Sequence, residues 1–352
     1  MNALNNVAAE LLETSAAGYA AAALALLQPG DGATPPGRDG ATWKTHFAQR
    51  VLELAAAVRV DEPVLFTRRI AWLRRAARAR GTGEQDLKRA LLSLRTALQR
   101  EMPDNLRPAI TPALDLAVGA FDDALVADPV ALDASRPVDR LALRYLTLCL
   151  EGKPHEAVEL VLAELDHGLA PTAIYTQVLI PAEKEIGELW HVGDVSIAEE
   201  HLVSETTREL MALIVAKHAP RHAHDRSLIA ASVAGNAHDI GLRAVADLFR
   251  LAGWRCLYLG ANVPAAELAR AAATFEVDLV VLSATLATQL KPLGEAIEAI
   301  RSLAPERKIL VGGLAFDGLP QLWKQLGADA YAPAIDAAAA LGDALVERGQ
   351  VT

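Results

Sequence analysis

The chain has 352 residues, of which 52% are hydrophobic, enough for two or more domains with substantial cores. Its 34 basic and 44 acidic side chains give a net charge of -10, which argues against a general nucleic-acid binder that relies on phosphate contacts, although a local basic patch is compatible with it. Two distant cysteines, Cys149 and Cys256, argue against a disulfide framework and a cysteine-based metal site. We therefore expect a cytoplasmic protein.

The N-terminal segment is rich in alanine, but Glu10 and Glu13 interrupt it and no basic region precedes it. We expect neither a signal peptide nor a membrane span. Residues 28–42 are rich in glycine and proline and predict a linker or loop. Apolar residues then recur at three- and four-residue spacing in several segments up to residue 125. The first predicted domain, residues 1–126, is therefore all helical.

Residues 127–222 form the second predicted domain. The apolar pattern there predicts four helices, separated by short joints that contain glycine or proline. Four helices with short connections favour a four-helix bundle.

Residues 223–352 form the third predicted domain, in which the period changes. Five β-rich runs alternate with amphipathic stretches of helical length. The runs cover residues 227–233, 255–259, 278–284, 308–313 and 329–332. This alternation predicts an α/β domain, a Rossmann-like doubly wound sheet of five parallel strands. The fold class is thus multidomain, with two helical domains before an α/β domain.

His238 follows the first of these strands, where ligands bind in doubly wound sheets. On its own it fits a solvated loop imidazole or a helix-capping residue about as well as a ligand. Asp239 beside it has the chemistry to orient the imidazole ring, as ligating histidines usually require. Gly235 and Gly241 permit a tight turn and the close approach of a bulky ligand.

Two further strand ends carry residues suited to the same ligand. Ser283 and Thr285 end the third strand with hydroxyls, and Gly312 with Gly313 end the fourth, where absent side chains leave room. The first turn lacks the glycine spacing of a nicotinamide fingerprint. The sequence therefore predicts a ligand site of another kind at this edge.

These motifs, "NAHDIG", "LSATL" and "VGG", resemble the cobalamin-binding Rossmann-like domain of methionine synthase and its relatives. The resemblance implies that His238 is the lower axial ligand of cobalt, that Ser283 and Thr285 meet the nucleotide tail, and that Gly312 and Gly313 line its channel. It also implies cofactor contacts in the first loop, from Asn236, Asp239, Ile240 and Gly241. Asn236 departs from the family, which has an acid at this position.

Trp190 precedes Glu200 and His201 in the second domain, with nine residues between Trp190 and Glu200. Taken alone, this spacing also fits a core tryptophan followed by an ordinary charged helix. Together with the downstream motifs it resembles the CarH-type cobalamin photoreceptors. That resemblance implies that the three residues cover the upper face of the corrin and make space for a 5'-deoxyadenosyl group, so adenosylcobalamin is the expected cofactor. His191 and His201 are the candidates for a second cobalt ligand once that group has left.

The order of helices in the first domain resembles the globin-like, bilin-binding region of photocobilins. The resemblance implies a bound bilin such as biliverdin, and the candidate residues to hold it are His46, Arg68, Arg69 and Trp72. Arginine forks suit the propionates of a linear tetrapyrrole, but the plainer interpretation is a solvated basic helix face and a surface histidine. Because neither cysteine precedes residue 149, a thiol linkage within this domain is excluded and the bilin would be noncovalent.

The sequence thus predicts a non-enzymatic, cobalamin-dependent light sensor, tuned by a bilin. No basic recognition helix with a wing is found in the first 125 residues, so direct DNA binding is not expected. An effector protein or a change of homo-oligomer is the expected output. A corrinoid protein that carries methyl groups for methyltransferases, and a light-independent B12 sensor, are the alternatives.

Overall fold

The computed structural model describes the chain except residues 1, 28–41, 82, 124–131, 221–224 and 350–352. It divides into two compact units, which are described separately below. The first unit is Met1–Pro129 with His191–Gly193, and the second is Val130–Trp190 with Asp194–Thr352. The domain boundaries predicted at 126/127 and 222/223, like most of the linker predicted at 28–42, lie outside the described residues.

The first unit is helical throughout its described residues, as the sequence predicts. Its helices are α1 (Ala3–Thr14), α2 (Ala16–Leu26), α3 (Trp43–Arg59), α4 (Pro63–Ala79), α5 (Glu84–Glu101) and α6 (Arg107–Gly119). Phe47 of α3 and Phe66 of α4 are fully buried in its core. Gly81, with φ of +62°, and Gly83, with φ of +59°, allow the sharp reversal between α4 and α5 because glycine has no Cβ.

The helical region of the second unit follows the predicted segments. Its elements are α7 (Pro137–Leu150), α8 (Pro154–Asp166), α9 (Pro171–Ile174), the π-helical segment η1 (Tyr175–Leu179), α10 (Ile180–Val192) and α11 (Ile197–His218). The sequence predicts one continuous helix over residues 170–193, but η1 interrupts it. Pro181, the second residue after η1, has no N–H to donate to the preceding turn, which accounts for the local change of pitch.

The α/β region contains the five parallel strands that the sequence predicts. They are β1 (Ser227–Val233), β2 (Arg255–Val263), β3 (Leu279–Ser283), β4 (Lys308–Gly312) and β5 (Ala330–Tyr331). Their order is β2-β1-β3-β4-β5. The topological switch point therefore lies between β1 and β3, and a ligand is expected beyond the carboxyl ends of these two strands.

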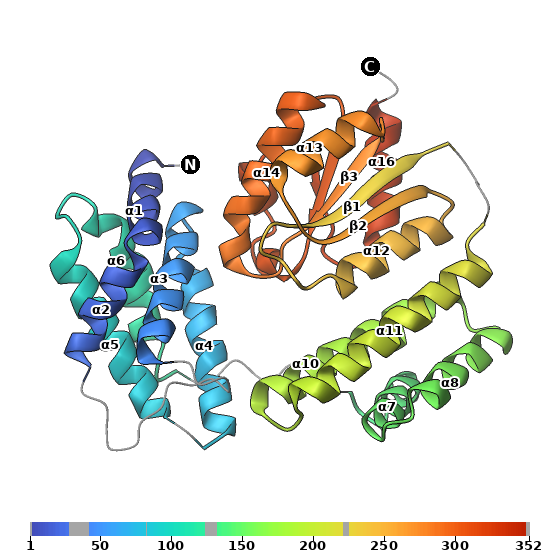
Figure 1. The fold of residues 1–352 in the computed structure, drawn as a ribbon, viewed down its shortest axis with the longest axis horizontal. Coiled ribbons are helices and arrows are strands. Elements are labelled where there is room, and N and C mark those ends of the chain that lie inside the picture. The colour runs from blue at the N-terminus through green and yellow to red at the C-terminus, as the bar shows by residue number, and fades with distance from the viewer. Residues whose placement is uncertain (1, 28–41, 82, 124–131, 221–224, 350–352) are drawn as a thin grey trace. The chain divides into compact units, whose positions relative to one another are not determined.

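Helices cover both faces of this sheet (Figure 1). They are α12 (Ile240–Leu251), α13 (Ala265–Thr274), α14 (Leu290–Leu303), α15 (Leu322–Gln325) and α16 (Ala337–Gly349). Helix α13 packs against α14, and α12 packs against α16. Among the described residues, no helix has the length and apolar character needed to cross a bilayer.

A buried carboxylate joins α12 to the helical region of the second unit. Asp247 is fully buried and accepts hydrogen bonds from Arg250 Nη1 at 2.7 Å and Arg243 Nε at 3.1 Å. It also accepts one from the Tyr175 hydroxyl, at 3.1 Å, on η1. Apolar residues of α12, including Ala244 and Leu248, join the core of helices α7 to α11. The sheet and this helical region therefore form one packed body.

Candidate functional site

The loop that carries His238 is held in place by a buried asparagine. Asn236 is fully buried, and its Oδ1 accepts a hydrogen bond from the His238 N–H at 3.1 Å. Its Nδ2 donates to the carbonyl oxygen of Ser283 at 3.1 Å, which links the first loop to the end of β3. The amide supplies both a donor and an acceptor, whereas an ionised carboxylate supplies acceptors only. Asn236, which stands where the family motif has an acid, thus holds the His238 loop against the end of β3.

Two further side chains, which sequence reasoning missed, fix the same loop. Gln289 is buried; its Oε1 accepts from the backbone N–H groups of Thr285 and Leu286 at 2.7 and 2.9 Å, and its Nε2 donates to the Gly235 carbonyl at 3.1 Å. Asn262 Oδ1 accepts from the Gly235 N–H at 2.7 Å. Asn262 has a φ of +56°, which asparagine tolerates better than most residues. The only feature of the sequence that could have indicated Gln289 or Asn262 is a polar residue within an apolar run near the end of a strand.

The His238 ring is exposed at this edge of the sheet. The hydrogen bonds of His238 to described residues involve only its backbone: its N–H donates to Asn236 Oδ1, and its carbonyl oxygen accepts from Ser232 Oγ at 3.4 Å. Within the described parts of the chain, neither ring nitrogen has a hydrogen-bond partner. An accessible imidazole at the switch point fits the axial ligand of a corrinoid cobalt.

Asp239 does not orient the His238 ring in this structure, contrary to the expectation. Its Oδ2 accepts a hydrogen bond from the Tyr258 hydroxyl at 2.8 Å, and its Oδ1 pairs with the Arg208 guanidinium of α11. Arg208 and Tyr258 lie on other elements, so their reach to Asp239 could not be seen in the sequence. The carboxylate instead fastens the start of α12 to α11 and β2.

Ser283, Gly312 and Gly313 meet at the ends of β3 and β4. Ser283 is buried and pairs in register with Gly312. Gly313 has a φ of +104°, and a Cβ there would lie 2.2 Å from the carbonyl oxygen of Ala284, so only glycine fits. A Cβ on Gly312 would come no closer than 3.5 Å to its nearest neighbour, the Ala332 carbonyl oxygen. Of the two glycines, Gly312 is thus the one with space beside it.

The remaining predicted contacts, Ile240 and Gly241 after the first loop and Thr285 after β3, differ in exposure. Thr285 and Ile240 are half-buried, and Ile240 also packs against the core of the helical region. Gly241 is exposed and has open space around it. These positions are compatible with contacts to a ligand at the sheet edge.

On the helical region, Trp190 is half-buried and packs against the core formed by α7 to α11. Glu200 and His201 lie near the start of α11, and Glu200 Oε2 lies 2.5 Å from His201 Nδ1. The His201 side chain is 71% exposed, so its other ring nitrogen can reach a ligand. Ser204 Oγ lies 3.0 Å from Glu200 Oε1 one turn later. The structure therefore joins Glu200 to His201 through a direct contact.

His191, a candidate second cobalt ligand, belongs to the first unit. It is buried and stacks on Trp72, with ring centroids 3.6 Å apart. Its Nε2 lies 2.9 Å from the Trp72 carbonyl oxygen. Burial lowers the pKa of His191 to about 4, so the ring is neutral and donates this hydrogen bond. In this arrangement its Nε2 is engaged within the first unit.

Of the candidate bilin residues of the first unit, Arg69 belongs to an ion cluster around Glu53, and the four residues differ in exposure. His46 is buried beside Trp43 and Phe47, and desolvation lowers its pKa to about 3. Arg69 bonds Glu53 at 2.8 Å, and its guanidinium lies 4.0 Å from the Trp72 ring centroid.

Arg50, which sequence reasoning missed, is buried and bonds the same Glu53 at 2.5 Å. Arg68 is exposed. The interpretation of His46 as a surface residue is wrong, because its side chain is buried. Arg69 is not only a solvated charge, because it forms an ion pair with Glu53. The two guanidiniums share one carboxylate.

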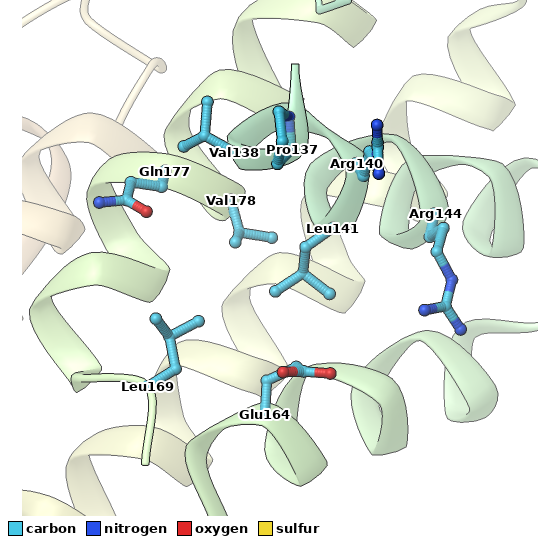
Figure 2. Close-up of a pocket in the computed structure, with 9 residues that line it drawn as sticks. All are labelled: Pro137, Val138, Arg140, Leu141, Arg144, Glu164, Leu169, Gln177 and Val178. Carbon is cyan, nitrogen blue, oxygen red and sulfur yellow. The ribbon is translucent and has the colours of Figure 1, made fainter. Parts of the chain in front are cut away.

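A separate hollow of about 310 Å³ lies among α7, α8 and η1 (Figure 2). Leu141, Leu169 and Val178 contribute apolar walls, and Arg144 and Glu164 lie at its edge. None of its lining residues is among those predicted to contact cobalamin.

Two regions of the chain match known families. Residues 226–341 match a model described as a B12 binding domain, and residues 141–214 match a second model with the same description. Together these regions contain all the residues assigned above to the cobalamin site.

Relatives and solved structures agree with this match. The HTH-type transcriptional repressor CarH of Myxococcus xanthus is 30% identical over 195 residues, which is 55% of this chain and 64% of CarH. A corrinoid protein of Desulfitobacterium hafniense (strain Y51) is 24% identical over 204 residues, 56% of this chain and 93% of that protein.

The structure of the Methanosarcina barkeri monomethylamine corrinoid protein superposes with a TM-score of 0.52 at 20% identity. It covers 60% of this chain and 99% of its own, which shows a shared fold. CarH is named as a transcriptional repressor, and this chain spans less than two thirds of its length. The comparisons thus support cobalamin binding by this chain and a likeness to CarH that is limited to part of each protein.

Proposed function

We propose that this protein is a cobalamin-dependent light sensor that binds adenosylcobalamin. The observation that carries the proposal is the exposed His238 ring at the switch point, on a loop that Asn236 and Gln289 tie to β3 and the segment after it. A rigid loop is needed because an axial ligand must hold its ring at a fixed position. His238 would ligate cobalt from below, and the space beside Gly312 would admit the nucleotide tail.

Trp190, Glu200 and His201 are proposed to cover the upper face and so select the adenosyl form. When bound, this cofactor supplies a cobalt–carbon bond that visible light cleaves. Trp190, Glu200 and His201 would contact the adenosyl group, so the helical region would favour one packing with that group present and another without it. His191 and His201 are the proposed second ligands, and His191 would first have to leave Trp72.

For the first unit we propose a globin-like sensory domain that binds biliverdin noncovalently. Its support is the buried cluster in which Arg50 and Arg69 share the single carboxylate Glu53, next to neutral His46 and Trp72. Two guanidiniums with one partner favour a further anionic group such as a propionate. Arg68, exposed on α4, would reach only a part of the ligand that faces solvent. We also propose that the signal is passed on in the cytoplasm by an effector protein or by a change of homo-oligomer. Direct DNA binding is not part of the proposal.

Absorption spectra test this function. The chain is purified with adenosylcobalamin and biliverdin, and spectra are recorded in the dark and after green and red light. We expect a His-on cobalamin spectrum that changes irreversibly under green light, and a separate far-red bilin band. If the spectrum of bound adenosylcobalamin is unchanged by light, the light-sensor function is excluded and a light-independent B12 sensor becomes the preferred function. The size-exclusion mass in dark and light tests the proposed oligomer change.

A methyl-carrying corrinoid protein is the second candidate function. It is favoured by the coverage of two corrinoid proteins, 93% and 99% of their lengths, by the part of this chain that they match. The discriminating assay offers the chain methylcobalamin and adenosylcobalamin in equal amounts. Preferential retention of methylcobalamin, with transfer of the methyl group to an added thiol acceptor, would replace the sensor proposal.

A further inference from the structure

A buried carboxyl group lies behind the Glu200–His201 pair. Glu183 is on α10, and its Oε1 is buried without a hydrogen bond to any described residue. Its Oε2 lies 3.1 Å from the hydroxyl oxygen of Ser204 on α11. Nothing in the sequence pattern singles out this residue, since a glutamate in the polar pattern of a helix is usually solvated.

Ser204 stands between two carboxyl groups. Its buried Oγ lies 3.1 Å from Glu183 Oε2 and 3.0 Å from Glu200 Oε1. A hydroxyl has one hydrogen to donate but can also accept. If both carboxyl groups were ionised, the Ser204 hydroxyl could donate its one hydrogen to only one of them, and the other oxygen–oxygen contact would not be a hydrogen bond. If one of them is protonated, it donates to Ser204 Oγ and both contacts are hydrogen bonds.

The surroundings decide which carboxyl group holds the proton. Tyr145 and Cys149 of α7 and Glu200 and Arg208 of α11 are the titratable groups that face Glu183. Burial raises the pKa of Glu183, Glu200 adds to the rise, and the hydroxyls of Thr207 and Ser204 and the charge of Arg208 oppose it. Arg208 is paired with Asp239 and Glu205. Glu200 has the more exposed carboxylate, 29% accessible, and a histidine beside it.

We propose that Glu183 is a neutral positioning residue for the Glu200–His201 pair. Its carboxylic O–H donates to Ser204 Oγ, the Ser204 hydroxyl donates to Glu200 Oε1, and Glu200 Oε2 accepts from His201 Nδ1–H. This chain fixes one His201 tautomer and leaves Nε2 free as an acceptor toward a ligand. The role toward a bound cofactor rests on the function proposed above; the protonation state does not.

The His201 pKa, followed by NMR in the cofactor-free full chain, tests the charge of Glu183. The substitution Glu183→Gln keeps the shape and an N–H donor for Ser204. Because it replaces one neutral group by another, it is expected to leave the His201 pKa unchanged. Glu200→Gln removes a charge beside the ring and should lower that pKa. A lower His201 pKa in Glu183→Gln would show that Glu183 is ionised and would overturn the proposal.

Infrared spectroscopy at neutral pH gives a second measurement. The wild-type chain should show a carbonyl band of a protonated carboxylic acid that Glu183→Gln removes. The control Glu209→Gln, an exposed position on the same helix as Ser204, should keep the band. Identical spectra of the wild type and Glu183→Gln in this region would contradict a neutral Glu183.

The substitution Ser204→Ala tests the positioning role. Without the hydroxyl, 15N NMR should show a smaller fraction of the His201 Nδ1–H tautomer, and adenosylcobalamin affinity should fall roughly two- to tenfold, the effect of one net hydrogen bond. An unchanged tautomer and affinity would overturn positioning. A wild-type chain that binds no adenosylcobalamin would instead sink the proposed function, while the cofactor-free measurements would still report on Glu183.

Discussion

The side-chain amide of Asn236 donates to the carbonyl oxygen of Ser283 across 3.1 Å, and so joins the His238 loop to the end of β3. Ser283 pairs with Gly312 in the next strand, so three strand ends that are far apart in sequence meet at one edge. The site depends on this meeting, because a ligand at the switch point must contact all three loops.

His238→Ala is expected to abolish the His-on spectrum of bound cobalamin, because it removes the only imidazole of the loop. The side chain is exposed, so the free energy of unfolding should change by no more than about 0.5 kcal/mol. Absorption spectra and urea unfolding measure the two effects. His167→Ala, an exposed histidine at the end of α8, is the control and should alter neither. A His-on spectrum that persists in His238→Ala would refute the ligand assignment.

Asn236→Ala should destabilise the second unit by about 1–3 kcal/mol, because it leaves the Ser283 carbonyl and the His238 N–H without their partner in a buried place. Cobalamin binding should weaken as well, since the loop loses its link to β3. Urea unfolding and cobalamin titration provide the measurements. The exposed Gln321→Ala serves as control, and equal stability of the two variants would speak against the link.

The two glycines after β4 should respond differently to alanine. Gly313→Ala places a Cβ 2.2 Å from the Ala284 carbonyl oxygen and requires a backbone with positive φ, so we expect a loss of stability of more than about 1 kcal/mol. Gly312→Ala has room for its methyl group and should fold normally, but should reduce cobalamin binding if the nucleotide tail passes there. Thermal unfolding and titration compare the pair. A Gly313→Ala protein as stable as wild type would contradict the observed backbone.

Asp247→Asn should destabilise the second unit by about 3–5 kcal/mol, because Arg243 and Arg250 then lack the carboxylate that pairs them. Tyr175→Phe removes one hydrogen bond to this carboxylate and should cost about 1.5–3 kcal/mol. Urea unfolding of both variants is the measurement. A larger loss in Tyr175→Phe than in Asp247→Asn would show that the arginines are not held by Asp247.

Stability of the first unit should fall as the pH is lowered from about 6.5, the ordinary pKa of histidine. Burial lowers the pKa of His46 to about 3 and that of His191 to about 4, so the unfolded chain takes up protons in this range that the folded unit does not. The free energy of unfolding, followed by hydrogen exchange in α3, therefore decreases with falling pH. His46→Phe should flatten this dependence, and an unchanged slope would contradict a buried neutral His46.

The strands of the second unit were predictable because buried parallel strands are continuous apolar runs between turn residues. β1 covers residues 227–233, as predicted. β2 continues beyond the predicted residue 259 to Val263. The sequence did not indicate this extension because Gly260 and Asn262 interrupt the apolar run there. The motif residues could be selected from the sequence, since Ser283 and Gly312 end such runs and His238 lies in the loop that follows β1.

Tertiary structure decided the contacts that these residues make. Asp239 was expected to orient the His238 ring but instead bonds Arg208 and Tyr258, because the packing of α11 and β2 brings those side chains within reach. The roles of Gln289 and Glu183 depend in the same way on elements that are distant in sequence. The sequence by itself determined which segments become strands and helices and which residues lie at their ends. Only the folded chain decided which polar groups form hydrogen bonds with each other. The partners come from elements that are distant in sequence, and no periodic pattern along the chain indicates which of these elements come close together.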